Sequence, residues 1–195
     1  VCASADGTGA AFAVKDGAWI RDAEPAGIRF IATVNQAFID EVQSENEGKT
    51  IVFGTEFSVP EADKVIRKDC EVWANESTET EKSYKTVLVG IPQDNYLTKI
   101  TAKAYYKVMN GETEEKLVYA DEIGVTRSIF EGAKAAAAAG ETNDFVSEII
   151  ANACKSHVWD NGKVVTAPTA DAMGETVYTC TKCGETETVN TLVGK

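Results

Sequence analysis

The chain has 195 residues, of which 31 are acidic and 19 are basic, so its formal net charge is −12 with histidine neutral. This excess of negative charge argues against nucleic acid and anionic lipid as partners, because both are bound mainly through lysine and arginine. No apolar run approaches the about 20 residues that a membrane-spanning helix needs. The sequence therefore predicts an acidic globular protein that is long enough to bury a core and has no membrane span.

The sequence predicts a mainly β fold in which residues 10–122 form a β-sandwich. In residues 99–108 apolar side chains alternate with mostly polar ones, which is typical of a strand with one buried and one wet face. Asn110-Gly111 after it is a hairpin signal, and one helix is expected at residues 35–45. Similar alternation predicts strands at residues 11–14, 18–21, 27–34, 50–59, 70–74, 86–91 and 116–120. Many short antiparallel strands at this spacing favour a sandwich.

A pair of helices is expected at residues 123–153, packed on the sandwich. Thr126 can cap the first helix, which continues through an alanine-rich stretch and ends at Gly140. Thr142 or Asn143 can cap the second helix, whose apolar residues recur at the spacing of one buried face.

Residues 154–195 carry few bulky apolar side chains, and a segment of this composition usually needs a staple in place of a core. Two pairs of metal ligands supply a candidate, because a two-residue gap lets both side chains of a pair reach one tetrahedral ion. The pairs are Cys154 with His157 and Cys180 with Cys183. Four protein ligands leave no open position, so we predict a structural Zn²⁺ in a zinc-ribbon-like module. The alternatives are a disulfide between Cys180 and Cys183, or two free thiols.

Composition alone does not decide the cellular compartment of the protein or the redox state of its cysteines. Of the five cysteines, Cys2 and Cys70 are left outside the metal set, and they either pair in an oxidising compartment or remain free. Residues 1–9 lack the basic start and apolar middle of a signal peptide, which fits a cytosolic chain and an already processed one equally.

Catalytic motifs are missing from the sequence. With His157 assigned to metal, no second histidine can act as the base for a serine or cysteine nucleophile. Gly7 and Gly9 begin a glycine fingerprint that is not completed, and abundant carboxylates are ordinary on an acidic surface. We therefore predict that the protein is not an enzyme.

Aromatic side chains suggest a binding site for carbohydrate. Alternation within residues 70–74 places Trp73 on the polar face of its strand, and the same logic places Trp19 beside Arg21. A flat exposed ring offers a stacking platform to a sugar. The candidate carbohydrate-binding residues are Trp73, Trp19, Tyr96, Asp94 and Asn95. The alternative is that each tryptophan packs beneath a helix or loop. Trp159 is expected to cover the metal site.

Several stretches resemble a domain of secreted and surface proteins from anaerobic Gram-positive gut bacteria. The resemblance covers about residues 15–135 and rests on an ordered set of motifs: GAWIR at 17–21, PAGIRF at 25–30, FGT at 53–55, LVGI at 88–91, NY at 95–96, the strand 100–108 and RSI at 127–129. The tail looks like a second module of such proteins, with WD at 159–160, PT at 168–169 and YTCTKCG at 178–184. The domain more often has a small residue at the position of Trp19, which makes Trp19 either a specialised platform or a local variation.

A sandwich followed by helices is also similar to the starch-adherence proteins of ruminococcal amylosomes. This resemblance implies a secreted, cell-surface protein that holds α-1,4-glucan near the junction of sandwich and helices, without catalytic residues. We therefore predict a non-catalytic carbohydrate-binding protein whose partners are starch or maltooligosaccharides and proteins of a surface assembly. Two alternatives remain: a protein-interaction or adhesin spacer with no glycan site, and a fragment of a glycoside hydrolase.

Overall fold

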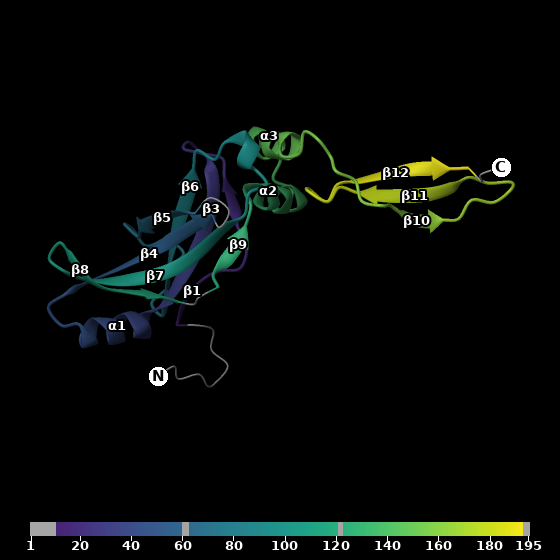
Figure 1. Cartoon of the computed structure of the whole chain (residues 1–195). Coiled ribbons are helices and arrows are strands. Elements are labelled where there is room, and N and C mark those ends of the chain that lie inside the picture. Colours follow the sequence, from purple (N-terminus) through teal and green to yellow (C-terminus); the bar gives the residue numbers. More distant parts are fainter. Residues whose placement is uncertain (1–10, 60–62, 121–122, 193–195) are drawn as a thin grey trace.

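The computed structural model describes residues 11–59, 63–120 and 123–192, and within them the chain is mainly β-structure. Figure 1 shows a body of strands and helices from which a small sheet at the C-terminal end projects. The strands form several sheets, and each strand pair in the described residues is antiparallel. The predicted mainly β class is confirmed.

The first sheet is built around β3. This strand pairs along its whole length with β6, while β1 and β2 pair with the two ends of its other edge. The strands are β1 Phe12–Val14, β2 Trp19–Arg21, β3 Gly27–Asn35 and β6 Glu81–Val89. Within the described residues β6 pairs with no other strand, so it forms one border of this sheet.

The second sheet is built around β4 and β7. β4 pairs with β5 on one edge and with β7 on the other, and β8 and β9 pair with β7 near its two ends. The strands are β4 Thr50–Val59, β5 Lys64–Asp69, β7 Ile100–Asn110, β8 Thr113–Tyr119 and β9 Val125–Arg127. The expected hairpin is confirmed, since Asn110 pairs with Thr113 across a turn that contains Gly111 in the left-handed conformation.

The helix α1 Gln36–Glu45 lies where it was predicted, directly after β3. The next helix, α2 Ile129–Ala138, begins later than predicted, because Ser128 caps it and forms a capping box with Glu131. The prediction that Thr126 is the cap is wrong. Thr126 belongs to β9, where its hydroxyl lies 2.8 Å from the hydroxyl of Thr101 on β7.

The third helix, α3 Asp144–Asn152, is capped by Asn143, whose Oδ1 accepts a hydrogen bond of 2.8 Å from the Val146 amide. The two helices pack against each other, and α2 also contacts β2 and β3. None of the helices in the described residues is long and apolar enough to cross a membrane.

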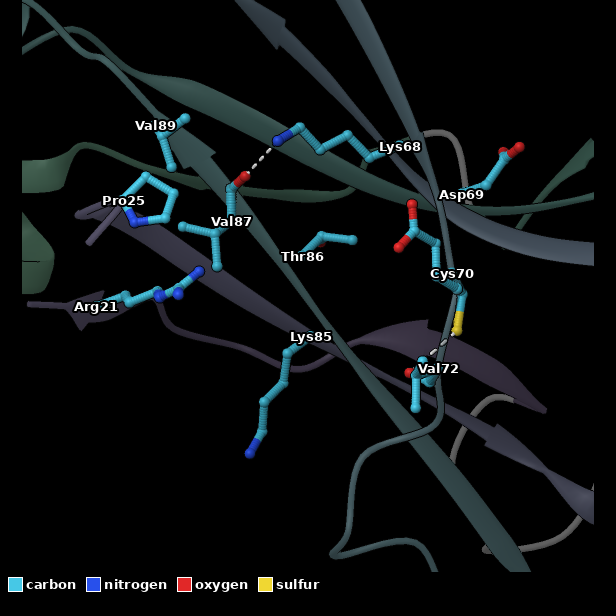
Figure 2. A pocket seen from close by; sticks show the side chains of 11 residues that line it. Arg21, Pro25, Lys68, Asp69, Cys70, Val72, Lys85, Thr86, Val87 and Val89 are labelled. Carbon is cyan, nitrogen blue, oxygen red and sulfur yellow. Dashed lines mark hydrogen bonds between the residues drawn. The ribbon is translucent and has the colours of Figure 1, made fainter. Parts of the chain in front are cut away.

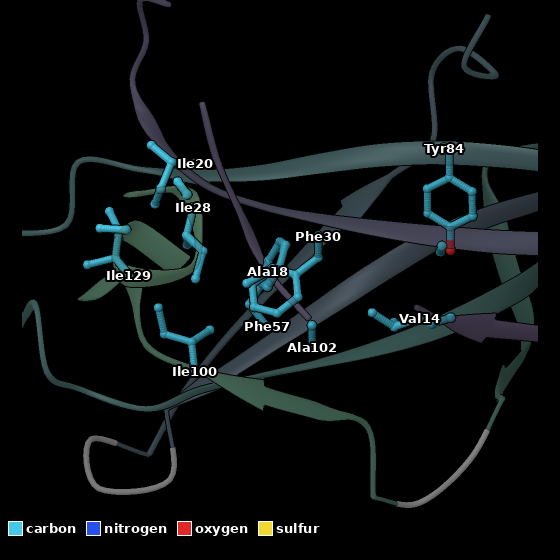
Figure 3. Close-up of a cluster of buried hydrophobic side chains, with 14 of the residues drawn as sticks. Val14, Ala18, Ile20, Ile28, Phe30, Phe57, Tyr84, Ile100, Ala102 and Ile129 are labelled. Carbon is cyan, nitrogen blue, oxygen red and sulfur yellow. The ribbon is translucent and has the colours of Figure 1, made fainter. Parts of the chain in front are cut away.

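One apolar cluster fills the space between the two sheets. The rings of Phe30 on β3 and Phe57 on β4 have centroids 5.6 Å apart, and those of Phe12 on β1 and Tyr106 on β7 are 5.7 Å apart. Ile129 of α2 joins the cluster at one end (Figure 3). Aromatic contacts between the sheets, together with this helix, therefore hold the body as one packed unit.

The prediction of a strand at residues 70–74 is wrong. β5 lies at residues 64–69 instead, and its signal was weak because it is a border strand with exposed side chains such as Val65. After Asp69 the chain leaves the second sheet and approaches the first, where the Ala74 amide donates a hydrogen bond of 2.7 Å to the Ser83 carbonyl of β6. Residues 125–127 also depart from the expected helical unit, because they pair with β7 as β9.

The projecting tail is a three-stranded sheet with almost no apolar interior. Its strands are β10 Lys163–Thr166, β11 Gly174–Thr179 and β12 Thr186–Thr191, in the order β10-β11-β12. The buried residues of the described tail are Gly174, Thr176, Cys180 and Cys183. Burial of side chains therefore contributes little to holding this sheet together.

A polar network covers part of the outer face of the second sheet. Tyr105 passes over Gly54, where a Cβ atom would lie 2.4 Å from the tyrosine ring, and its hydroxyl donates a hydrogen bond of 2.5 Å to Asp69. The Lys107 ammonium lies 2.8 Å from the other Asp69 oxygen. Burial raises the pKa of Asp69, but the hydrogen bonds from Lys107 and Tyr105 outweigh it and leave this pKa below its usual value.

Replacing Asp69 tests this network. Because the pKa of Asp69 is lowered on folding, its contribution is present above its unfolded pKa of about 3.9 and is lost as the pH falls through the folded value. The carboxyl is partly exposed, so we expect Asp69→Asn to lower the free energy of unfolding at pH 7 by about 0.5–1 kcal/mol. Urea denaturation from pH 7 to pH 2.5 should show this difference shrinking below about pH 4. The exposed Asp22→Asn serves as control, and a pH-independent difference would contradict the assignment.

Candidate metal centre

The four predicted metal ligands lie together at the junction of the body and the tail. Cys154 follows α3, His157 lies three residues further on, and Cys180 and Cys183 flank the turn between β11 and β12. Their ligand atoms all lie within 4.8 Å of one another. These residues therefore could hold one metal ion, as the spacing predicted.

Two of the distances between ligand atoms are close to those of a tetrahedral site. With metal–sulfur bonds of about 2.3 Å and metal–nitrogen bonds of about 2.0 Å, two sulfurs lie about 3.8 Å apart and a sulfur and a nitrogen about 3.5 Å apart. The Sγ atoms of Cys154 and Cys180 are 3.9 Å apart, and Cys183 Sγ is 3.5 Å from His157 Nδ1. The described cysteines are free thiols, so the alternative of a disulfide between Cys180 and Cys183 is not present in the structure.

The turn after β11 directs backbone amides at one sulfur. The Gly184 amide donates to the Cys180 carbonyl over 2.8 Å, and Gly184 has a φ of 74°, which glycine adopts without strain. Burial raises the pKa of Cys180, but backbone amides of Cys183, Val158 and Lys182 donate to its sulfur and bring this pKa to about 5. A sulfur held in this way is prepared to bind a metal as thiolate.

Neighbouring side chains orient the histidine. The ring of Trp159 stacks on that of His157 with centroids 5.0 Å apart, so Trp159 lies against the cluster as expected. The His157 Nε2 atom lies 3.6 Å from a Glu185 oxygen, while Nδ1 faces the sulfurs. A carboxylate beside the distal nitrogen is the common outer partner of a metal-bound histidine, because it fixes the ring and its tautomer.

The cluster also borders the helices of the body. A cavity of about 510 Å³ lies between α2, α3 and the metal ligands, lined by Phe130, Lys134, Ile150 and Cys154 among others. The Lys155 ammonium reaches the body as well and donates a hydrogen bond of 3.1 Å to Gln93. The four ligands thus join the end of α3 to the projecting sheet.

Trp73 lies differently from its predicted position. The expectation that it occupies the polar face of a strand is wrong: Val72 is 78% exposed, while the half-buried Trp73 ring packs against Phe53 at 5.8 Å and against Tyr84 at 5.9 Å. Part of the residue still borders a groove of about 420 Å³, which it shares with Glu71. The structure thus holds Trp73 rigidly at the rim of a groove.

The other four candidate residues are dispersed. Trp19 is half-buried opposite Arg29, with Ala18 and Ile20 buried on the other face as the alternation predicted. Tyr96 is only 5% exposed, so its ring offers little surface on which a sugar could stack. Its hydroxyl donates to Glu148 over 3.3 Å. Asp94 and Asn95 are exposed on the short 3₁₀ helix Gln93–Asn95 before it.

A larger groove, which sequence reasoning missed, lies between β5 and β6 (Figure 2). Its volume is about 700 Å³, and it shares Cys70, Glu71 and Val72 with the groove beside Trp73. Lys68 crosses it, donating a hydrogen bond of 2.7 Å to the Val87 carbonyl. Cys70 is a free thiol, while Cys2 lies outside the described residues. Alternation along β6 could have placed Thr86 on the face of Tyr84, but only the packing of the sheets brings β5 beside β6.

Comparison with family models, with curated proteins and with solved structures found no match to the chain.

Replacing one cysteine tests the metal centre. We expect Cys180→Ser to lose stoichiometric metal, because a hydroxyl is a poor replacement for a thiolate ligand, whereas Cys70→Ser should retain one ion per chain. Elemental analysis of the purified proteins measures both. Absence of metal from the parent protein, with Cys180 and Cys183 joined in a disulfide by mass spectrometry, would contradict the assignment.

Proposed function

We propose that the cluster holds a structural zinc ion that closes the C-terminal module as a zinc ribbon. Three sulfurs and one imidazole nitrogen form a donor set typical of structural zinc, and the ligand distances support this choice. Cys154, His157, Cys180 and Cys183 would hold the ion, with Glu185 and Trp159 orienting the histidine. When bound, zinc supplies the cross-links that a tail without an apolar core lacks.

Zinc removal should affect the tail and leave the body folded. We expect a zinc chelator to collapse the amide NMR signals of β10, β11 and β12, because ligand bonds replace core packing there. Signals of β3 and β7 should persist, since their apolar core does not include the tail strands. Re-addition of zinc should restore the lost signals and magnesium should not. Unchanged tail signals after complete metal removal would refute this role.

We propose further that the body is a β-sandwich that binds carbohydrate without catalysis, in a secreted protein of a cell-surface assembly. The observation that carries this proposal is Trp73, whose ring is fixed by Phe53 and Tyr84 while the residue borders a groove. A ring that is already immobile loses little conformational freedom when a sugar stacks on it. Glu71 in the same groove offers a carboxylate to sugar hydroxyls.

The ligand that we propose is an α-glucan, namely starch or maltooligosaccharides. The chain carries a net charge of −12, which suits a neutral polysaccharide recognised by stacking and hydroxyl hydrogen bonds. Trp73 is the first binding residue, with Trp19, Asp94 and Asn95 as more distant contributors. Tyr96 is too buried to serve as a stacking platform. The competing function is a spacer or adhesin domain, which the projecting tail in Figure 1 would also suit.

Affinity electrophoresis in gels containing soluble starch separates these two functions. We expect starch to retard the parent protein and Trp73→Ala to lose at least tenfold in affinity, because a central aromatic contact is removed. Trp73→Phe keeps an aromatic ring against Phe53 and Tyr84, so it should retain the fold and part of the affinity. Trp19→Ala should lose less affinity than Trp73→Ala, because Trp19 is proposed as a more distant contributor.

If starch does not retard the parent protein, the spacer or adhesin function is favoured. Release of reducing sugar from maltooligosaccharides would instead favour the glycoside hydrolase.

A further inference from the structure

The groove between β5 and β6 is the opening between the two sheets of the body. Each of these strands borders its sheet, so the side chains that meet here come from two separate sheets. Figure 2 shows Lys68 and Thr86 projecting into the space between β6 and the segment that carries Cys70 and Val72. The groove therefore reaches from the surface toward the interior of the body.

Thr86 is a buried polar group without a partner. It is 6% exposed, it lines this groove, and within the described residues its Oγ1 atom has no hydrogen bond. Buried hydroxyls in folded proteins nearly always form a hydrogen bond with protein or water, because a buried hydroxyl without a hydrogen bond is unfavourable. The Thr86 hydroxyl is thus a buried group beside the groove that has no protein partner.

The position of Thr86 relates it to Trp73. Tyr84, which packs edge-on against Trp73, lies two residues before Thr86 and so on the same face of β6, about 7 Å along the strand. The grooves beside Trp73 and Thr86 share residues 70–72 as a common wall. A ligand that stacks on Trp73 would have to extend over this wall to approach Thr86.

The remaining polar groups of the groove fit an uncharged, hydroxyl-rich ligand. The Lys68 ammonium uses one hydrogen on the Val87 carbonyl and keeps two for other acceptors. The lining residues include three cations, Arg21, Lys68 and Lys85, and two carboxylates, Asp69 and Glu71. This near balance gives little attraction for a polyanion, whereas donors and acceptors are both present for hydroxyl groups.

We propose that the groove between β5 and β6 is a second sugar subsite, in which Thr86 and Lys68 hydrogen-bond the α-glucan chain that stacks on Trp73. The proposal rests on the carbohydrate-binding function proposed above and extends its site from one aromatic contact to a path between the two sheets. The alternative is that only a water molecule hydrogen-bonds to Thr86.

The test compares two buried hydroxyls that differ in their relation to the groove. Thr86→Val removes the hydroxyl and keeps the branched shape of the side chain. Thr55→Val does the same at a residue that is 1% exposed on β4 and does not line the groove. Isothermal titration calorimetry with maltoheptaose measures the affinity of both, of Lys68→Met and of Trp73→Ala, with thermal unfolding as the check on folding.

We expect Thr86→Val and Lys68→Met each to weaken maltoheptaose binding about three- to tenfold, the range for one lost hydrogen bond. Thr55→Val should bind like the parent. The subsite is overturned if Thr86→Val binds maltoheptaose like the parent, or if Thr55→Val weakens binding as much as Thr86→Val does. If Trp73→Ala still binds more weakly than the parent in that case, the proposed carbohydrate-binding function stands. If the parent itself binds no maltoheptaose, both proposals fall.

Discussion

Aromatic packing between the two sheets fixes the geometry of the body. Phe30 packs against Phe57 and holds β3 over β4, while Phe12 packs against Tyr106 and holds β1 over β7. Burial of these rings favours the arrangement. Since β3 and β4 lie within their sheets, bringing them face to face also sets β6 beside β5. The same packing creates the groove between these border strands, where Lys68 meets an otherwise open carbonyl of β6.

The tail lacks the apolar core that stabilises the body. Its strands expose most of their side chains, so backbone hydrogen bonds alone would leave a small sheet marginal in water. Cys154 and His157 come from the segment after α3, while Cys180 and Cys183 come from the turn before β12. A metal bound to all four would therefore close the sheet and tie it to the body at once, which makes the junction depend on metal occupancy.

The sequence predicted those features that depend on local chemistry. Alternation predicted β7, and the Asn110-Gly111 pair predicted the turn to β8. The ligand spacing predicted the four residues that lie together. Sequence reasoning missed the cap of α2, although Ser128 followed by Glu131 is a capping-box signature, and Thr126 pairs with β7 as part of β9 instead. The groove escaped prediction because it depends on how two sheets pack rather than on any one segment.

The prediction from alternation fails at Trp73, and this failure coincides with the candidate binding site. Alternation assumes a continuous strand, but β5 ends at Asp69 and the following residues cross from the second sheet to the first. The chain direction changes there, so Val72 points outward and Trp73 turns inward onto Phe53 and Tyr84. This crossing covers β6 near Ser83 and leaves its later residues open to the groove. The residues that break the strand pattern are thus those that build the wall between the two grooves.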